Sequence, residues 1–227
     1  MAKVEQASAS TYRLIVVGGH TRSIGKTQLV CDLIAALPEA NFLAGKITQY
    51  GHGVCAANGE RCGCAPDEHA SAFSWEESAT SGTDSARFLA AGARHAFWLR
   101  TKQGFLAEGM PALRESLRAI TADSATAPVN VIVESNSLLQ FLKPSLYLVV
   151  LDPQREDFKP SAQSILDRAD AYVLRHEVSG GSTVWPQISP KLLHARPEFV
   201  QPEGEPLPQP LLSLVRDLLA RPPSVRI

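Results

Sequence analysis

A glycine-bounded loop that ends in lysine and threonine is the feature of this sequence that most clearly predicts chemistry. The stretch 16–30 reads VVGGHTRSIGKTQLV, in which an apolar run and two glycines precede a polar loop and Gly25-Lys26-Thr27. At a turn from strand to helix, successive backbone N–H groups can bind phosphate, a lysine adds positive charge at the outer oxygens, and the next hydroxyl binds Mg²⁺. The sequence therefore predicts a phosphate-binding loop.

One position of this loop departs from the common pattern. Glycine usually stands where this chain has His20, and Gly19 takes that role if the loop is one residue longer. The alternative is a plain glycine turn in which Lys26 is merely solvated. The predicted nucleotide-binding residues are Gly19, His20, Thr21, Arg22, Ser23, Ile24, Gly25, Lys26, Thr27 and Gln28.

Two carboxylates lie at the ends of predicted elements, where a metal ion could bind. Glu134 ends an apolar strand, and in a parallel sheet this places it at the carboxyl edge, where we expect it to bind Mg²⁺ or to orient the attacking group. Capping of the next short helix is the alternative role for Glu134, and helix capping competes equally with metal binding for Asp84. Lys46 either reaches a phosphate or an acidic substrate, or is solvated. We expect Lys26, Glu134 and Asp84 to be catalytic, and Thr27 and Glu134 to bind Mg²⁺.

A second group of chemically capable side chains lies in the segment 51–70, GHGVCAANGERCGCAPDEHA. Thiolates and imidazoles close together can form a tetrahedral Zn²⁺ site, which would also order a long loop. Reduced thiols without metal and a disulfide are the alternatives, because the cysteine spacing is not that of a standard zinc finger. Cys31 stands apart and is expected in the core. The possible Zn²⁺ ligands are His52, Cys55, Cys62, Cys64 and His69.

Strand and helix signals alternate along most of the chain, which predicts an α/β fold with a mainly parallel central sheet flanked by helices. We expect one domain over residues 1–227, with a Cys/His-rich loop insertion at about 48–82 that shows little periodicity. The strands are predicted at 12–17, 41–47, 95–100, 129–134, 146–152 and 170–175, with a further one at 198–201. The helices are predicted at 26–37, 83–91, 104–120 and 161–168, with a closing helix from Pro210.

Three segments of the chain resemble known proteins, in the same order along the sequence. The loop 19–27 is similar to the longer phosphate loop of dethiobiotin synthetase. The segment 82–93, GTDSARFLAAGA, is similar to the "GKDS…R…AGA" segment of MobB, the nucleotide-binding protein of molybdopterin-guanine dinucleotide synthesis, and VIVE at 131–134 is similar to its strand that ends in Glu. The resemblance implies a P-loop containing nucleoside triphosphate hydrolase fold, with Mg²⁺ and ATP or GTP bound.

Two departures leave the finer assignment open. Ser135 follows Glu134, where MobB has glycine. The Asn-Lys-x-Asp motif by which many GTPases recognise guanine is missing, since Arg175-His176-Glu177 follow YVL at 172–174. The sequence therefore does not choose between ATP and GTP.

The composition of the chain limits the classes of partner that it is expected to bind. With 22 basic and 23 acidic residues, the chain has no excess charge that would indicate nucleic acid or an anionic membrane. We expect a cytoplasmic protein, since no apolar run approaches the length of a membrane helix. Leu212, Val215 and Leu219 of the closing helix either pack on the sheet or contact a second subunit of a homodimer.

Two functions follow from these patterns. The first is a Mg²⁺-dependent protein that binds ATP or GTP and hydrolyses the terminal phosphate or transfers it to an unknown small molecule or cofactor precursor, with molybdenum cofactor biosynthesis as the setting that the resemblance implies. The second is a non-enzymatic metal carrier or adaptor, in which nucleotide acts as a switch and the Cys/His loop, with Zn²⁺, carries the metal function.

Overall fold

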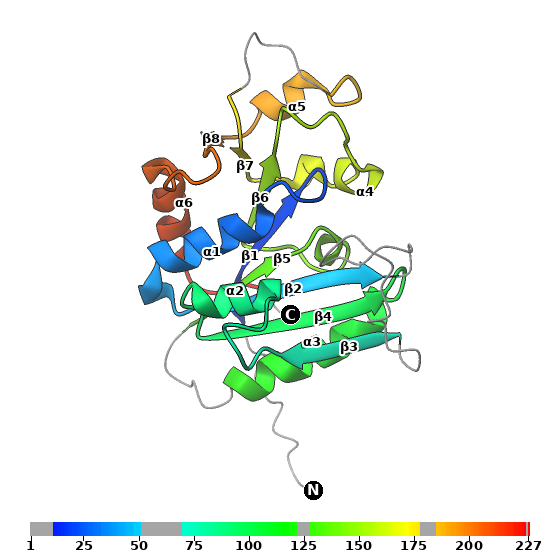
Figure 1. The fold of residues 1–227 in the computed structure, drawn as a ribbon, viewed down its shortest axis with the longest axis vertical. Coiled ribbons are helices and arrows are strands. Elements are labelled where there is room, and N and C mark those ends of the chain that lie inside the picture. Colours follow the sequence, from blue (N-terminus) through cyan, green and yellow to red (C-terminus); the bar gives the residue numbers. More distant parts are fainter. Residues whose placement is uncertain (1–10, 51–69, 122–127, 178–184, 226) are drawn as a thin grey trace, which may run out of the picture.

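The chain forms an α/β fold around one eight-stranded sheet (Figure 1). The computed structural model describes residues 11–50, 70–121, 128–177, 185–225 and 227. The strand order is β3-β4-β2-β5-β1-β6-β7-β8, and every neighbouring pair is parallel except β3 and β4. The strands are β1 (Tyr12–Gly19), β2 (Leu43–Tyr50), β3 (Ser71–Trp75), β4 (His95–Lys102), β5 (Val129–Glu134), β6 (Leu146–Leu151), β7 (Ala171–Leu174) and β8 (Glu198–Val200).

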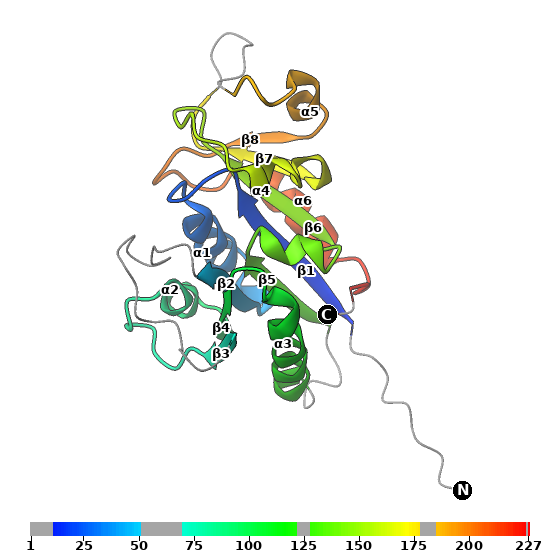
Figure 2. The same ribbon diagram turned by 90° about the vertical axis from the view of Figure 1, so that its right-hand side faces the viewer.

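Helices cover both faces of this sheet. The longer ones are α1 (Lys26–Ala36), α2 (Asp84–Ala90), α3 (Leu106–Thr121) and α6 (Gln209–Leu219). Shorter helices are α4 (Pro160–Gln163) and α5 (Pro190–His194), with 3₁₀ turns at Pro38–Ala40, Ser137–Gln140 and Leu166–Arg168. Figure 1 shows α1 and α2 in front of the sheet, and Figure 2 shows α2 and α3 on opposite sides of β4. Among the described residues, no helix is long and apolar enough to cross a bilayer.

Alternation along the strands divides the core into two halves. Leu14 and Val16 of β1 pack with α3, whereas Ile15 and Val17 pack with α1, α2 and α6. Successive side chains of a strand point to opposite faces, and a strand that is buried on both faces is apolar throughout. This explains why YRLIVV is a nearly continuous apolar run.

The connections that leave β1 and β5 lie on opposite faces. The chain passes from β1 through α1, which packs with one half of the core, and from β5 through the turn at 137–140, which packs with the other half. Where the connections that follow two neighbouring parallel strands leave on opposite faces of the sheet, a crevice opens outside the carboxyl ends of those strands. The fold therefore predicts a binding crevice between the ends of β1 and β5.

The structure confirms an α/β fold with a mostly parallel sheet flanked by helices and corrects one segment. The sequence predicts a loop insertion at about 48–82, but β2 continues to Tyr50 and residues 71–75 form the edge strand β3. All five residues of β3 are only half-buried, and Phe73 stacks on Phe97 of β4. A short edge strand with a single covered face shows only weak alternation of apolar and polar residues. Because the surrounding segment is polar, this two-residue period does not stand out in the sequence.

Gly45 of β2 offers a test of how tightly this sheet is packed. Gly45 pairs in register with Phe97, and a Cβ atom at Gly45 would lie 2.0 Å from the Phe97 ring. We expect Gly45→Ala to lower the free energy of unfolding by about 1–3 kcal/mol, measured in denaturant, because either the ring or the strand must shift. Gly45→Ala combined with Phe97→Leu should cost less than the sum of the two single changes. Strictly additive losses would show that the ring does not need the glycine.

Candidate functional site

A cavity of about 700 Å³ lies at the carboxyl ends of β1, β2 and β5. The loop between β1 and α1 forms much of its wall. Ser23 (φ 52°) and Gly25 (φ 83°) adopt left-handed backbone conformations, and Gly25 caps α1 without any side-chain hydrogen bond. In the described part of the chain, the backbone N–H groups of Gly25, Lys26 and Thr27 donate to no acceptor. These are donors of the kind that helix N-termini offer to anions.

Lys26 is the first residue of α1 and is largely buried in this loop. Its Nζ donates to the carbonyl oxygen of Thr21 over 2.6 Å, so the ammonium lies inside the curve of the loop. Burial lowers the pKa of Lys26 to about 8, although the charge of Glu134 opposes this shift. A largely buried ammonium group that makes one hydrogen bond within the described residues is well placed to bind an anion in the cavity.

Three oxygen-bearing side chains converge on the ammonium group of Lys46. Its Nζ forms an ion pair with Asp84, lies 3.1 Å from Glu134 Oε1, and lies 3.5 Å from Thr27 Oγ1. Thr27 donates in turn to Glu134 Oε2 over 2.6 Å. Burial alone lowers the pKa of Lys46, but the charges of Glu134 and Asp84 outweigh it, so the pKa is raised. The cluster carries a formal charge of −1 and presents oxygen atoms, the donors that Mg²⁺ prefers.

Strand register explains why these groups meet. Lys46 of β2 and Glu134 of β5 are partners in register, and so are Ala44 and Ile132, two residues earlier on each strand. Ala44 and Ile132 belong to the half of the core that contains α1 and α2. Since the period of a strand is two, Lys46 and Glu134 point to the same face. The N-termini of α1 and α2 begin at that face and supply Thr27 and Asp84.

Asp84 and Lys46 both have partners that the sequence left open. Thr83, rather than Asp84, caps α2, because its hydroxyl accepts from Ala86 N over 3.0 Å. The Asp84 carboxylate is thereby free to reach Lys46, and a second ion pair joins it to Arg87 at 3.7 Å. The Lys46 side chain is 13% exposed, so a solvated lysine at the strand end is not what the structure contains.

His20 occupies the position where the loop pattern usually has glycine. Its ring is fully buried between Phe158 and Trp185, with centroids 5.2 and 4.9 Å away. Asp152 N donates to Nε2 over 3.1 Å, so Nδ1 carries the proton and donates to the carbonyl oxygen of Asp157 over 2.9 Å. Within 19–28, His20 alone does not line the cavity. An imidazole fits here because its side chain lies beneath the loop and not in it.

Two residues that sequence reasoning missed hold the loop in shape. Asn136, two positions after Glu134, accepts from Gly19 N over 2.9 Å and donates to Gly19 O over 2.8 Å. Arg175, after β7, donates to the carbonyl oxygens of Ile24 (3.2 Å) and Gly25 (2.6 Å). Its position directly after a buried strand was the only signal in the sequence.

A chain of hydrogen bonds continues from Arg175 around the base of α1. Arg175 donates to Gln201, Gln201 donates to Asp32 over 2.8 Å, and Gln28 donates to the other oxygen of Asp32 over 2.7 Å. Arg87 of α2 closes the chain with a 2.7 Å bond to Gln28. The loop is therefore fixed to α2 on one side and to the segment after β8 on the other.

The predicted site residues separate into two groups. One cavity is lined by Asp84, Glu134 and nine of the ten residues of 19–28, and these nine include Lys26 and Thr27. His52, Cys55, Cys62, Cys64 and His69 fall at 51–69, outside the described residues. Among the residues that are described, no group of three His, Cys, Asp or Glu side chains is arranged to hold a metal ion. Cys31 is buried in the core, as expected, and burial raises its pKa to about 11.

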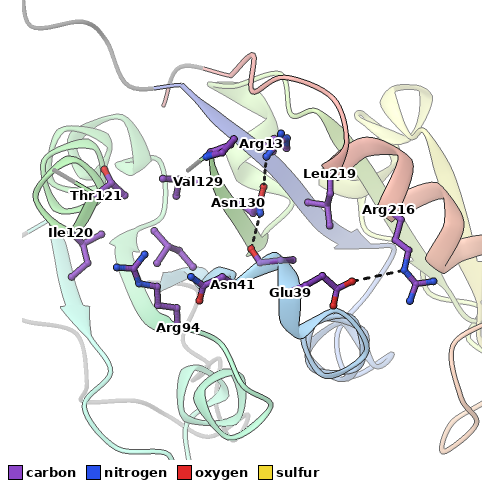
Figure 3. Close-up of a pocket in the computed structure, with 13 residues that line it drawn as sticks. Arg13, Glu39, Asn41, Arg94, Ile120, Thr121, Val129, Asn130, Arg216 and Leu219 are labelled. Carbon is purple, nitrogen blue, oxygen red and sulfur yellow. Dashed lines mark hydrogen bonds and ion pairs between the residues drawn. The ribbon is translucent and has the colours of Figure 1, made fainter. Parts of the chain in front are cut away.

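A second cavity, of about 540 Å³, lies at the opposite edge of the sheet (Figure 3). Its polar side chains are mostly joined to one another or to the backbone. Arg13 donates to Asn130, Asn130 donates to Ala40 O over 2.7 Å, and Arg216 pairs with Glu39 at 4.0 Å. None of the predicted site residues within the described ranges lines it. These contacts join β1, β5, α6 and the turn after α1, which is a structural role.

Comparison with known proteins adds no further assignment. The chain matches no profile of a known protein family, no curated protein and no solved structure.

The buried histidine makes the stability of the loop depend on pH. Burial lowers the pKa of His20 below its ordinary value of 6.5, so the neutral ring stabilises the fold above that pH and this contribution is lost as the pH falls below it. We expect the gap in unfolding free energy between the wild type and His20→Phe to narrow between about pH 8 and about pH 5. Denaturant titrations at each pH measure this gap, and a gap that does not change with pH would contradict the lowered pKa of His20.

Arg175 should be important for stability, although it lies just after the short strand β7. Arg175→Met leaves the Ile24 and Gly25 carbonyl groups and Gln201 without their donor, and each such loss costs about 1–3 kcal/mol. We expect a total loss of about 3 kcal/mol or more in unfolding free energy, a smaller loss for Arg175→Lys, and a change within about 0.5 kcal/mol for the exposed control Arg155→Met. Equal effects of the Arg175→Met and Arg155→Met variants would disprove the role.

Proposed function

We propose that this protein binds a nucleoside triphosphate with Mg²⁺ in the 700 Å³ cavity and hydrolyses or transfers its terminal phosphate. The observation that carries the proposal is the combination of three first-turn amides, a buried ammonium and an oxygen-rich cluster around a single loop. Phosphoryl transfer depends on positioning and on charge that offsets what develops on the phosphate oxygens. The amides can position the phosphate, the ammonium group can offset its charge, and the oxygen cluster can hold the metal ion.

In this proposal the residues divide the work. The backbone N–H groups of Gly25, Lys26 and Thr27 bind phosphate oxygens, and the Lys26 ammonium leaves the carbonyl of Thr21 to bind the outer phosphates. The Thr27 hydroxyl and the carboxylates of Glu134 and Asp84 are hard oxygen donors that fit Mg²⁺. The metal, when bound, neutralises charge on the phosphate chain. Glu134, 5% exposed, is protected from solvent and is the better placed to orient an attacking group.

The finer assignment follows the resemblance to MobB and dethiobiotin synthetase. The P-loop containing nucleoside triphosphate hydrolase fold, a setting in cofactor biosynthesis and a small-molecule or cofactor-precursor acceptor are all parts of this proposal. The mostly parallel sheet, with the loop between β1 and α1 and the carboxylate at the end of β5, supports it. The nucleotide-switched metal carrier depends on cysteines outside the described residues, and no contact among the described residues favours it.

Nucleotide binding should depend on Lys26 and on its charge. We expect Lys26→Ala to weaken ATP and GTP binding by about a hundredfold or more in calorimetry with Mg²⁺, which corresponds to about 2.7 kcal/mol. Wild-type affinity should fall as the pH rises through about 8, because the free protein then loses the proton on Lys26 that the anion requires. Lys26→Ala should lack this pH dependence.

The exposed Lys102→Ala is the matched control, because it removes the same charge outside the cavity. A thermal-shift panel of ATP, GTP and their diphosphates then identifies the preferred base, since a ligand bound only by the folded state raises its melting temperature. Unchanged affinity in Lys26→Ala would refute the proposed site.

A further inference from the structure

We propose that the Lys46 ammonium occupies the cation position between Thr27, Asp84 and Glu134, and that Lys46 leaves these oxygens when a divalent cation binds there. The inference rests on the proposed function, which assigns Mg²⁺ to the same oxygens. It adds an exchange of cations, in which either the Lys46 ammonium group or the metal ion, but not both, occupies the site.

The contacts of Lys46 carry this inference. One ammonium group reaches both carboxylates and lies 3.5 Å from the hydroxyl, and these are the three oxygen donors proposed for the metal. Glu134 is almost fully buried, so its charge requires a nearby cation at all times. Lys46 supplies that cation from the neighbouring strand.

The two cations exclude each other for a geometric reason. Mg²⁺ requires oxygen atoms at about 2.0–2.1 Å in an octahedral arrangement, which leaves no space for an ammonium group bound to the same oxygens. Repulsion between the two positive charges acts in the same direction. Lys46 must therefore give up Asp84 and Glu134 to allow the metal to bind.

The cavity indicates what Lys46 does after release. Its side chain lines the same 700 Å³ space as the loop, together with Thr48 and Gln49, which follow it on β2. A released ammonium on this wall can bind an anionic group of the phosphate chain or of the acceptor. Lys46 becomes a positioning residue that is available only once the divalent cation is bound, so the acceptor side of the site forms after the metal side.

Binding of Mn²⁺ to the full chain without nucleotide tests the exchange. Lys46→Met removes the competing ammonium, and we expect it to bind Mn²⁺ about tenfold more tightly than the wild type, measured by electron paramagnetic resonance. Lys159→Met is the matched control, because it removes the same charge from the same cavity wall, whereas the ion pairs of Asp84 and Glu134 within the described residues are with Lys46 and Arg87. Its affinity should stay at the wild-type value. Adding Glu134→Gln to Lys46→Met should abolish the gain, which assigns the bound Mn²⁺ to this site.

A second measurement on the wild type avoids any problem of folding in the variant. Acetylation of Lys46, followed by mass spectrometry, should become faster when Mg²⁺ is added, while acetylation of Lys102 should not change. Equal Mn²⁺ affinity in the wild type and in Lys46→Met, or a Lys46 acetylation rate that does not change when Mg²⁺ is added, would overturn the exchange. Neither result would contradict nucleotide binding. If neither protein binds Mn²⁺, the exchange fails together with the metal assignment, whereas a failure of nucleotide binding would appear in the Lys26→Ala calorimetry.

Discussion

The buried ion pair between Lys46 and Glu134 is the interaction on which the carboxyl edge of the sheet depends. Glu134 is the last residue of the interior strand β5 and has almost no access to water, and an unpaired carboxylate there would be strongly destabilising. Lys46 is its partner in strand register, and Thr27 contributes a hydrogen bond from the start of α1. Three elements, β2, β5 and α1, are therefore joined through one carboxylate.

The parts of the structure that could be predicted from sequence are those with local signals. The loop 19–27 is contiguous, and Glu134 is recognisable because an acid directly follows an apolar run. Alternating apolar segments gave the α/β class and most strand positions. The strand β3 was missed because its five residues alternate only on one half-covered face at the edge of the sheet.

The residues that sequence reasoning missed act over long separations. Asn136 contacts Gly19 across 117 positions, and Arg175 contacts Gly25 across 150. Neither belongs to a motif, and an asparagine or arginine after a strand is common on any surface. The same limit applied to Lys46, whose two carboxylate partners lie 38 and 88 positions away. Only the fold reveals that these side chains converge.

The contacts of Arg175 and Gln201 have a consequence for how the protein matures. The guanidinium that binds the Gly25 carbonyl group is translated 150 residues after Gly25, and Gln201 is translated later still. Chains grow at about 5–20 residues per second, so the N-terminal part waits several seconds or more for these partners. A nascent or truncated polypeptide that ends before Arg175 lacks the donor to the Ile24 and Gly25 carbonyl groups, so its loop between β1 and α1 is incompletely fixed.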